Sequence, residues 1–176
     1  MKKLAESHRD KLIDVLNERL TFERIGVQLY DRILGVLQSS GPELAGGKLF
    51  GQLRDHRNEE KEHEEWLEAQ IRALGGTAHE DTEHSRLVME ESKGIGDVIL
   101  RGESNLPHMF HALLAAELVD NAGWDLLVQL ADEAHDHEAK REFKHRLHEE
   151  EQHLLLMRKL VIRDTESEVF EGQPAM

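Results

Sequence analysis

The stretch RNEEKEHEEW, residues 57–66, is almost entirely polar, and it places Glu60 three residues before His63. Residues three apart lie on the same face of an α-helix. On a helix over 43–74 this face is apolar toward both ends and polar only in its middle turns. In chain order the face carries Leu49, Leu53, His56, Glu60, His63, Leu67, Ile71 and Leu74. The pattern predicts that Glu60 and His63 lie inside a helical core, between two apolar layers.

The rest of the chain is also predicted to be helical, because its apolar residues recur at three- and four-residue spacing and it contains only 3 prolines. The expected helices span 6–38, 43–74, 106–131 and 136–164. A helix of thirty residues is about 45 Å long, so the segment 75–105 is long enough to run back along such a bundle. The sequence predicts one all-α domain over 1–165, in which this crossover contains short helical segments and joins two antiparallel helix hairpins. The acidic residues 166–176 are predicted to form a flexible C-terminal tail.

Each of the other three expected helices also has ionisable residues in the middle of its apolar face. They are Glu23 in the first helix, Glu117 in the third, and Glu150 with His153 in the fourth. A further pair, Glu142 and His145, has the same Glu-x-x-His spacing but lies about 100° away around the helix axis. The phase of a residue on its helix therefore selects the candidates, and the spacing alone does not.

The two halves of the chain resemble each other around the first and third helices. TFERIGVQLYDRIL, residues 21–34, aligns with AAELVDNAGWDLLV, residues 115–128, so that Glu23 matches Glu117 and Tyr30 matches Trp124. Such internal symmetry is expected to place the candidates of one half opposite those of the other.

Four buried carboxylates cannot all stay ionised without compensation, because the burial of unpaired charge is strongly unfavourable. Two divalent metal ions would neutralise the four glutamates, and His63 and His153 would add uncharged nitrogen ligands. The chain has 0 cysteines, which excludes thiolate metal sites, iron–sulfur clusters and disulfides. The sequence therefore predicts a dinuclear metal site built from oxygen and nitrogen ligands.

Charge and hydropathy restrict the partners. The formal net charge of −14 disfavours nucleic-acid binding and attracts cations. The N-terminal MKKLAESHRD has no apolar segment of the kind found in signal peptides, and no long apolar run follows. We therefore expect a cytoplasmic protein that binds neither nucleic acid nor a membrane.

These residues resemble the ferritin-like diiron-carboxylate superfamily, which includes ferritins, bacterioferritins and rubrerythrins. In that superfamily helices 1 and 3 each carry one glutamate, and helices 2 and 4 each carry Glu-x-x-His. The matching residues here are Glu23, Glu60, His63, Glu117, Glu150 and His153. The resemblance implies a ferritin-like four-helix bundle with two iron ions per chain held by these six residues. Helix 2 lacks the methionine that a bacterioferritin-like haem would need, so haem is not expected.

Four further residues have roles that follow from the resemblance or from their position. Tyr30 is similar to the tyrosine that lies beside the metals in this superfamily, and it is the candidate catalytic residue. Asp120 stands where rubrerythrin-like centres carry an additional carboxylate. His56 and Arg146 occupy equivalent places on helices 2 and 4, either as additional ligands or as groups that orient the ligands.

The resemblance implies a protein that oxidises Fe(II) with O2 or H2O2, of the ferroxidase or peroxide-scavenging type. Glu60 and Glu150 would bridge the two ions, Glu23 and Glu117 would be terminal ligands, and each histidine would bind one ion. The alternatives are manganese as the metal in a catalase-like enzyme, an iron storage or binding protein without turnover, and a metal-free structural bundle. A homo-oligomer and an external electron donor are also expected, although the exposed helix faces, taken as charged all round, identify no partner surface.

Overall fold

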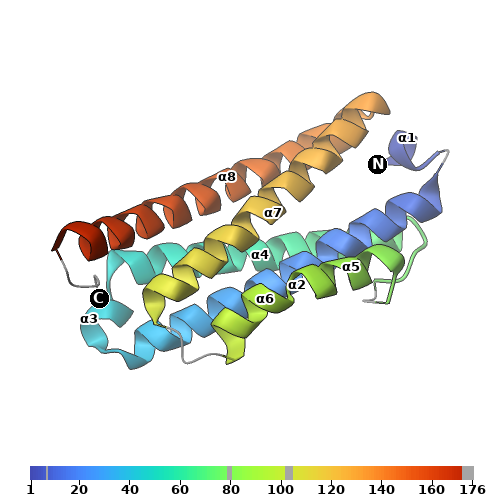
Figure 1. Cartoon of the computed structure of the whole chain (residues 1–176). Coiled ribbons are helices and arrows are strands. Elements are labelled where there is room, and N and C mark those ends of the chain that lie inside the picture. The colour runs from blue at the N-terminus through green and yellow to red at the C-terminus, as the bar shows by residue number, and fades with distance from the viewer. Residues whose placement is uncertain (7, 79–80, 102–104, 172–176) are drawn as a thin grey trace.

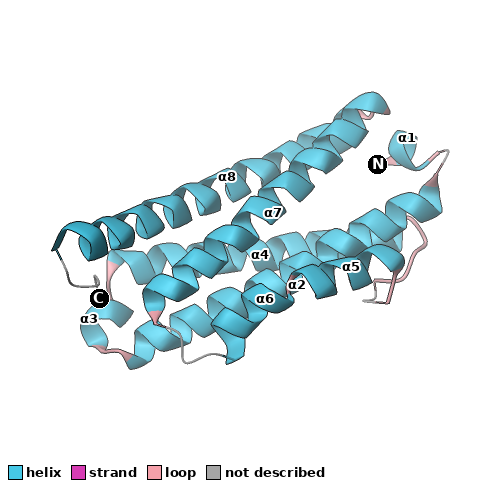
Figure 2. Ribbon diagram, in the orientation of Figure 1, coloured by secondary structure: helices cyan, strands magenta, loops and turns pink. Residues whose placement is uncertain are grey.

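The computed structural model describes residues 1–6, 8–78, 81–101 and 105–171, which form helices joined by short turns (Figures 1 and 2). One hairpin pairs α2 (Arg9–Ser39) with α4 (Lys48–Ala73), and the other pairs α7 (Leu106–Glu133) with α8 (His137–Glu166). Contacts of α2 with α7 and of α4 with α8 join the two hairpins into a four-helix bundle. The predicted all-α bundle of two helix hairpins is confirmed.

The segment between the hairpins is a crossover with short helices, as predicted. It contains α5 (Glu83–Glu91), α6 (Lys93–Gly96) and the π-helix η1 (Asp97–Arg101). Thr82 and Ser85 begin α5 with reciprocal hydrogen bonds between side chain and backbone, which satisfy amide groups that a helix start leaves without partners. Both α5 and η1 lie against α2 (Figure 1), so the crossover covers one side of that helix before α7 begins.

Several helix boundaries differ from those predicted. Residues 43–74 are not one helix, because the chain forms the short α3 (Pro42–Ala45) and begins α4 only after Gly46 and Gly47. Two consecutive glycines favour such a break, since glycine is a poor helix former. Met1 precedes a separate short helix, α1 (Lys2–Ala5). At the other end, η2 (Ser167–Glu171) continues α8 into the expected tail, and 172–176 lie outside the described residues.

The starts of α7 and α8 follow from their capping residues. The side chain of Asn105 accepts a hydrogen bond from the backbone N–H of His108 at 3.0 Å, and Pro107 lies in the first turn of α7. Asp136 accepts a hydrogen bond from the backbone N–H of Ala139 at 3.1 Å at the start of α8. These side chains replace the missing intrahelical partners and fix the start of each helix.

Among the described residues, the apolar core of the bundle consists of two clusters. One cluster includes Leu29, Ile33, Leu53, Phe110, Met157 and Leu160, and the other includes Leu16, Leu20, Leu67, Trp124 and Phe143. Each cluster draws residues from all four long helices, and on each helix the ionisable candidates lie between the two sets. The core thus has apolar ends and an ionisable middle, as the helix faces predict.

The surface is less uniformly charged than expected. Leu118, Val119 and Leu126 on α7, and Leu155 and Ile162 on α8, are each between 46% and 57% exposed. The expectation that the exposed helix faces are charged all round is therefore wrong for these two helices. Among the described residues, no helix combines the length and apolarity that crossing a bilayer requires.

Candidate metal centre

The six candidate ligands are brought together at the junction of the two apolar clusters, and none is more than 2% exposed. They are Glu23 on α2, Glu60 and His63 on α4, Glu117 on α7, and Glu150 and His153 on α8. These side chains from four helices meet at one place because each lies on the inward face of its helix.

Glu150 lies between the two imidazole rings. Its Oε1 is 2.9 Å from Nδ1 of His63, and its Oε2 is 3.2 Å from Nδ1 of His153. The same nitrogen of His63 is 3.3 Å from Glu23 Oε2, and that of His153 is 3.4 Å from Glu60 Oε1. Ligand atoms therefore group around two neighbouring positions that share Glu150. One group is Glu23, His63 and Glu150, and the other is Glu60, Glu117, Glu150 and His153.

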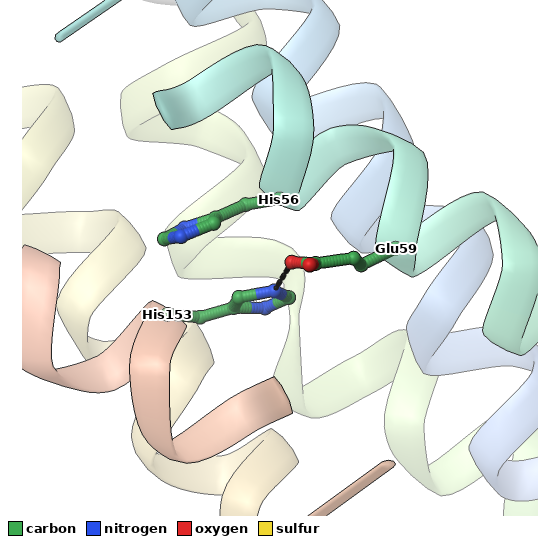
Figure 3. A group of neighbouring side chains, drawn as sticks. All are labelled: His56, Glu59 and His153. Atoms are coloured by element: carbon green, nitrogen blue, oxygen red, sulfur yellow. Dashed lines mark hydrogen bonds and ion pairs between the residues drawn. The ribbon is translucent and has the colours of Figure 1, made fainter. Parts of the chain in front are cut away.

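The outer nitrogens of both histidines are held by carboxylates from the opposite helix. Nε2 of His63 on α4 lies 2.9 Å from Glu149 Oε2, and Nε2 of His153 on α8 lies 2.8 Å from Glu59 Oε2 (Figure 3). An N–H on Nε2 that donates to these carboxylates leaves the Nδ1 lone pair free to face the centre. Glu59 and Glu149 thus orient both imidazoles and increase their basicity toward a metal.

The single glutamates of α2 and α7 are each hydrogen-bonded by an aromatic side chain from the other of these two helices. The Tyr30 hydroxyl on α2 donates to Glu117 Oε1 at 2.7 Å, and Trp124 Nε1 on α7 donates to Glu23 Oε1 at 2.8 Å. Each glutamate therefore has one oxygen fixed by a neutral donor. The other oxygen, Oε2, is buried without a hydrogen-bond partner in both residues.

Gly26 leaves room for the carboxylate of Glu60 where α2 passes it. A Cβ atom at position 26 would lie 2.5 Å from Glu60 Oε2 and 3.0 Å from its Cδ, so the carboxylate would have to move. Position 26 is three residues after Glu23, on the inward side of the helix. The absent side chain makes the space that Glu60 occupies.

Burial raises the pKa of two of these glutamates, Glu60 and Glu117, and neighbouring carboxylates raise it further. Burial, then Glu150 and Glu23, hold the pKa of Glu60 well above its ordinary value. Burial is also the main cause that raises the pKa of Glu117 to about 8. For His63, burial alone would lower the pKa, but the carboxylates of Glu149, Glu150 and Glu23 raise it overall. The metal-free centre therefore keeps protons that a free carboxyl or imidazole would lose.

We expect the metal-free protein to become less stable as the pH rises from about 5 to about 8. Glu117 has an ordinary pKa of 4.5 and a folded-state pKa of about 8, so between these values the folded state binds the extra proton. Its contribution to stability is present below pH 4.5 and is lost as the pH rises through 8. The raised pKa of His63 acts in the same direction. Chemical denaturation with a chelator present, at several pH values, measures the slope.

The variant Glu117→Gln serves as the control, because glutamine cannot titrate. It should show a smaller loss of stability over the same pH range. A metal-free protein whose free energy of unfolding increases with pH across this interval would contradict the protonated centre.

The residues fit a pair of divalent ions, as judged by their atoms without partners. All six have at least one buried oxygen or nitrogen that lacks a hydrogen-bond partner within the described part of the chain, and Glu150 has two. The inward-facing Nδ1 atoms are among them, since their short approaches to carboxylate oxygens are not aligned for hydrogen bonding. Buried polar atoms are normally paired, so this group of unpaired atoms is suited to binding metal ions. Carboxylate and imidazole together suit iron, manganese or zinc.

Asp120, an additional candidate, is buried and forms an ion pair with Arg19. Nη1 of Arg19 is 3.0 Å from both the carboxylate Oδ1 and the backbone oxygen of Asp120, and Arg19 is only 1% exposed. A Cβ atom at Gly123 would lie 1.8 Å from this Nη1, so the guanidinium needs a glycine there. The carboxylate also borders the centre, because one of its oxygens groups with Glu23, Glu60 and Glu150.

His56 and Arg146, the other two candidates, differ from each other in their surroundings. The ring of His56 stacks on that of His153 with centroids 4.2 Å apart, and its Nδ1 is buried without a partner (Figure 3). Burial, then the charge of His153, lowers its pKa to about 4. Arg146 instead lies over the Trp66 ring and donates to the backbone oxygen of Glu142 at 2.8 Å.

Three residues at the centre were not predicted from the sequence. Glu59 and Glu149 were missed although a signal existed, because each directly precedes a Glu-x-x-His pair and the segment Glu-Glu-x-x-His occurs on both helices. Arg19 was also missed. An arginine in the first helix is ordinarily expected in solvent, and only the glycine across from it hints at its burial.

Comparison with known proteins agrees with this architecture. A family model described as "Domain of unknown function (DUF892)" matches residues 7–169. The chain is also similar to a solved structure described as "Crystal structure of ferritin like, diiron-carboxylate proteins from Bacillus anthracis str. Ames", at 17% sequence identity and a TM-score of 0.66. The alignment covers 88% of this chain and 99% of that one. No curated protein matches the chain.

A likeness at this level of identity establishes the fold, and it confirms the ferritin-like bundle that the helix pattern predicts. The family match is independent of it and spans almost the whole sequence. The chain is therefore a member of the family described as domain of unknown function DUF892, with a ferritin-like fold and a buried cluster of glutamates and histidines at its centre.

Proposed function

We propose that this protein binds two Fe(II) ions at the buried centre and oxidises them with O2 or H2O2. The observation that carries the proposal is the set of unpaired buried atoms on Glu23, Glu60, His63, Glu117, Glu150 and His153. A purely structural polar layer would pair these atoms with one another, since an unsatisfied buried polar group is unfavourable. A metal-free structural bundle is therefore the weaker alternative.

The ligand set matches the charge of two Fe(II) ions. Four ionised glutamates balance two divalent ions, and the two imidazoles are neutral when they bind metal. In our proposal Glu60 and Glu150 would be shared by the two ions, Glu23 and Glu117 would be terminal ligands, and each histidine would bind one ion. The position of Glu150 between both Nδ1 atoms, at 2.9 and 3.2 Å, supports a bridging role for that residue.

The reaction balances with two electrons from two Fe(II) ions. With O2 and two protons the products are two Fe(III) and one H2O2, and with H2O2 and two protons they are two Fe(III) and two water molecules. The chain's own part is to hold the ions side by side and to exclude bulk water. Tyr30 donates its hydroxyl hydrogen to Glu117 and would keep that carboxylate in place as the charge on the ions changes. Protons leave Glu60 and Glu117 when the ions bind, because ligands must be deprotonated.

Elemental analysis of protein loaded anaerobically with Fe(II), before and after exposure to air or H2O2, tests the proposal. We expect two ions per chain and near-ultraviolet absorbance of Fe(III) that grows only after the oxidant is added. Fewer than two ions, or absorbance that does not change, would contradict it. Size-exclusion chromatography tests the storage alternative, because storage needs a closed hollow oligomer. Loading with Mn(II) followed by addition of H2O2 tests the catalase-like alternative.

A further inference from the structure

The line along which α4 and α8 face each other, here called the seam, passes the centre and has two different ends, although the sequence repeats there. His56 and Glu59 lie at one end, and Glu149 and Arg146 lie at the other. The segment 59–63 on α4 corresponds to 149–153 on α8, and each begins with a glutamate that holds the histidine of the other. The correspondence fails three residues earlier, where α4 has His56 and α8 has Arg146. Three residues is about one turn of helix, so both side chains border the outermost glutamates.

Arg146 closes its end of the seam with a permanent positive charge. Its guanidinium carbon lies 3.7 Å from the centroid of the Trp66 ring, and its Nη1 donates to the Glu142 backbone oxygen at 2.8 Å. Arginine stays protonated in proteins, and the stacked ring keeps it in this position. A divalent cation that approaches Glu149 and His63 along the seam would meet this charge.

The His56 end offers ligands instead of a cation. The ligand atoms of His56, Glu59 and His153 lie within 4.8 Å of one another (Figure 3). His56 Nδ1 has no hydrogen-bond partner, and the Glu59 side chain is 35% exposed, which connects this end to solvent. Glu59 uses Oε2 to hold His153, so its second oxygen can bind a cation. Leu156 stands where the symmetry would put a second Trp66, so no tryptophan is available to fix a cation here.

We propose that Fe(II) enters the centre through the His56–Glu59 end of this seam, where His56 and Glu59 are the first side chains to bind it, and that Arg146 blocks entry at the other end. The inference rests on the proposed function, because it names the route that the substrate ion takes to that site. A half-exposed carboxylate beside an imidazole attracts a divalent cation and strips part of its water shell. The cation then moves inward by about one helix turn to reach Glu60 and His153.

The test is the rate of anaerobic Fe(II) uptake by the metal-free protein. A chelator that becomes coloured when it binds Fe(II) is added at set times after mixing, and its absorbance measures the Fe(II) that the protein has not yet bound. His56→Arg copies the closed end onto the open one. We expect it to take up Fe(II) at least about ten-fold more slowly, within the range by which local charge changes association rates. Arg146→His opens the closed end and should bind Fe(II) at least as fast as the wild type.

A matched pair separates the route from the positioning of the histidines. Glu59→Gln and Glu149→Gln each weaken the hold on one histidine, but only Glu59 lies on the proposed route, so Glu59→Gln should slow uptake more. His56→Gln, in which no charge is buried, should also slow uptake with unchanged helicity, and it covers the case in which His56→Arg fails to fold. The route would be overturned if His56→Gln took up Fe(II) as fast as the wild type and Glu59→Gln took it up as fast as Glu149→Gln. A wild-type chain that binds fewer than two Fe(II) ions would overturn the proposed function itself.

Discussion

Glu60→Gln is expected to reduce Fe(II) binding from two ions per chain to at most one, and to slow Fe(II) oxidation at least about 100-fold. Groups that only orient metal ligands typically contribute 10–100-fold, and Glu60 is placed as a ligand itself. Glutamine keeps the shape of the side chain but lacks the negative charge that a bridging position needs. Elemental analysis and the absorbance of Fe(III) after oxidant is added measure both effects.

The same substitution should leave the metal-free protein as stable as the wild type. Burial and the neighbouring carboxylates hold the pKa of Glu60 well above its ordinary value, and glutamine imitates the uncharged form that burial favours. Glu62→Gln on the exposed side of α4 is the matched control, since it makes the same substitution on the same helix. Equal metal content in the wild type and both variants would exclude Glu60 from the site. A Glu60→Gln protein that unfolds would instead assign it a structural role.

The fold was predictable because two signals agree along the chain. Apolar residues at three- and four-residue spacing give helices, and the long segment between the second and third helices gives the crossover. The buried cluster of glutamates and histidines was predictable because the phase of these residues places an ionisable side chain on an otherwise apolar face, which is rare in a helix that packs only apolar side chains. Glu142 and His145 show the limit of spacing alone, since His145 is exposed.

The details that were missed depend on distances between helices. On α2 a strict seven-residue repeat that includes Leu20 would put Val27 and Leu34 on the buried face. The buried residues are Gly26 and Ile33, since such a repeat drifts against a helix with 3.6 residues per turn. The hydrogen bond between Glu59 and His153 depends on how far α4 is shifted along its axis relative to α8. The sequence of either helix alone does not determine that shift. Gly26 and Gly123 are informative only once the side chains facing them, Glu60 and Arg19, are known.

Asp120→Ala is expected to lower the free energy of unfolding by about 3–5 kcal/mol, the usual cost of removing one partner of a buried ion pair. The variant would leave Arg19, which is 1% exposed, with only the backbone oxygen of residue 120 beside Nη1. Its Nε already lacks a partner. In a chain of this size the loss corresponds to a melting temperature lower by about 10 °C, which thermal denaturation of the metal-free protein measures.

The reverse substitution, Arg19→Met, should cost less, and the comparison distinguishes an ion pair from simple packing. Without Arg19, Asp120 can lose its charge by binding a proton, because burial and nearby carboxylates already hold its pKa well above the ordinary value. Without Asp120, Arg19 keeps its buried charge, since a guanidinium does not lose its proton. The double variant Arg19→Met/Asp120→Leu should recover most of the stability, as buried ion pairs replaced by apolar side chains often do. If Arg19→Met proved as costly as Asp120→Ala and the double variant worse than either, packing of Arg19 on Phe22 rather than charge would be the main contribution.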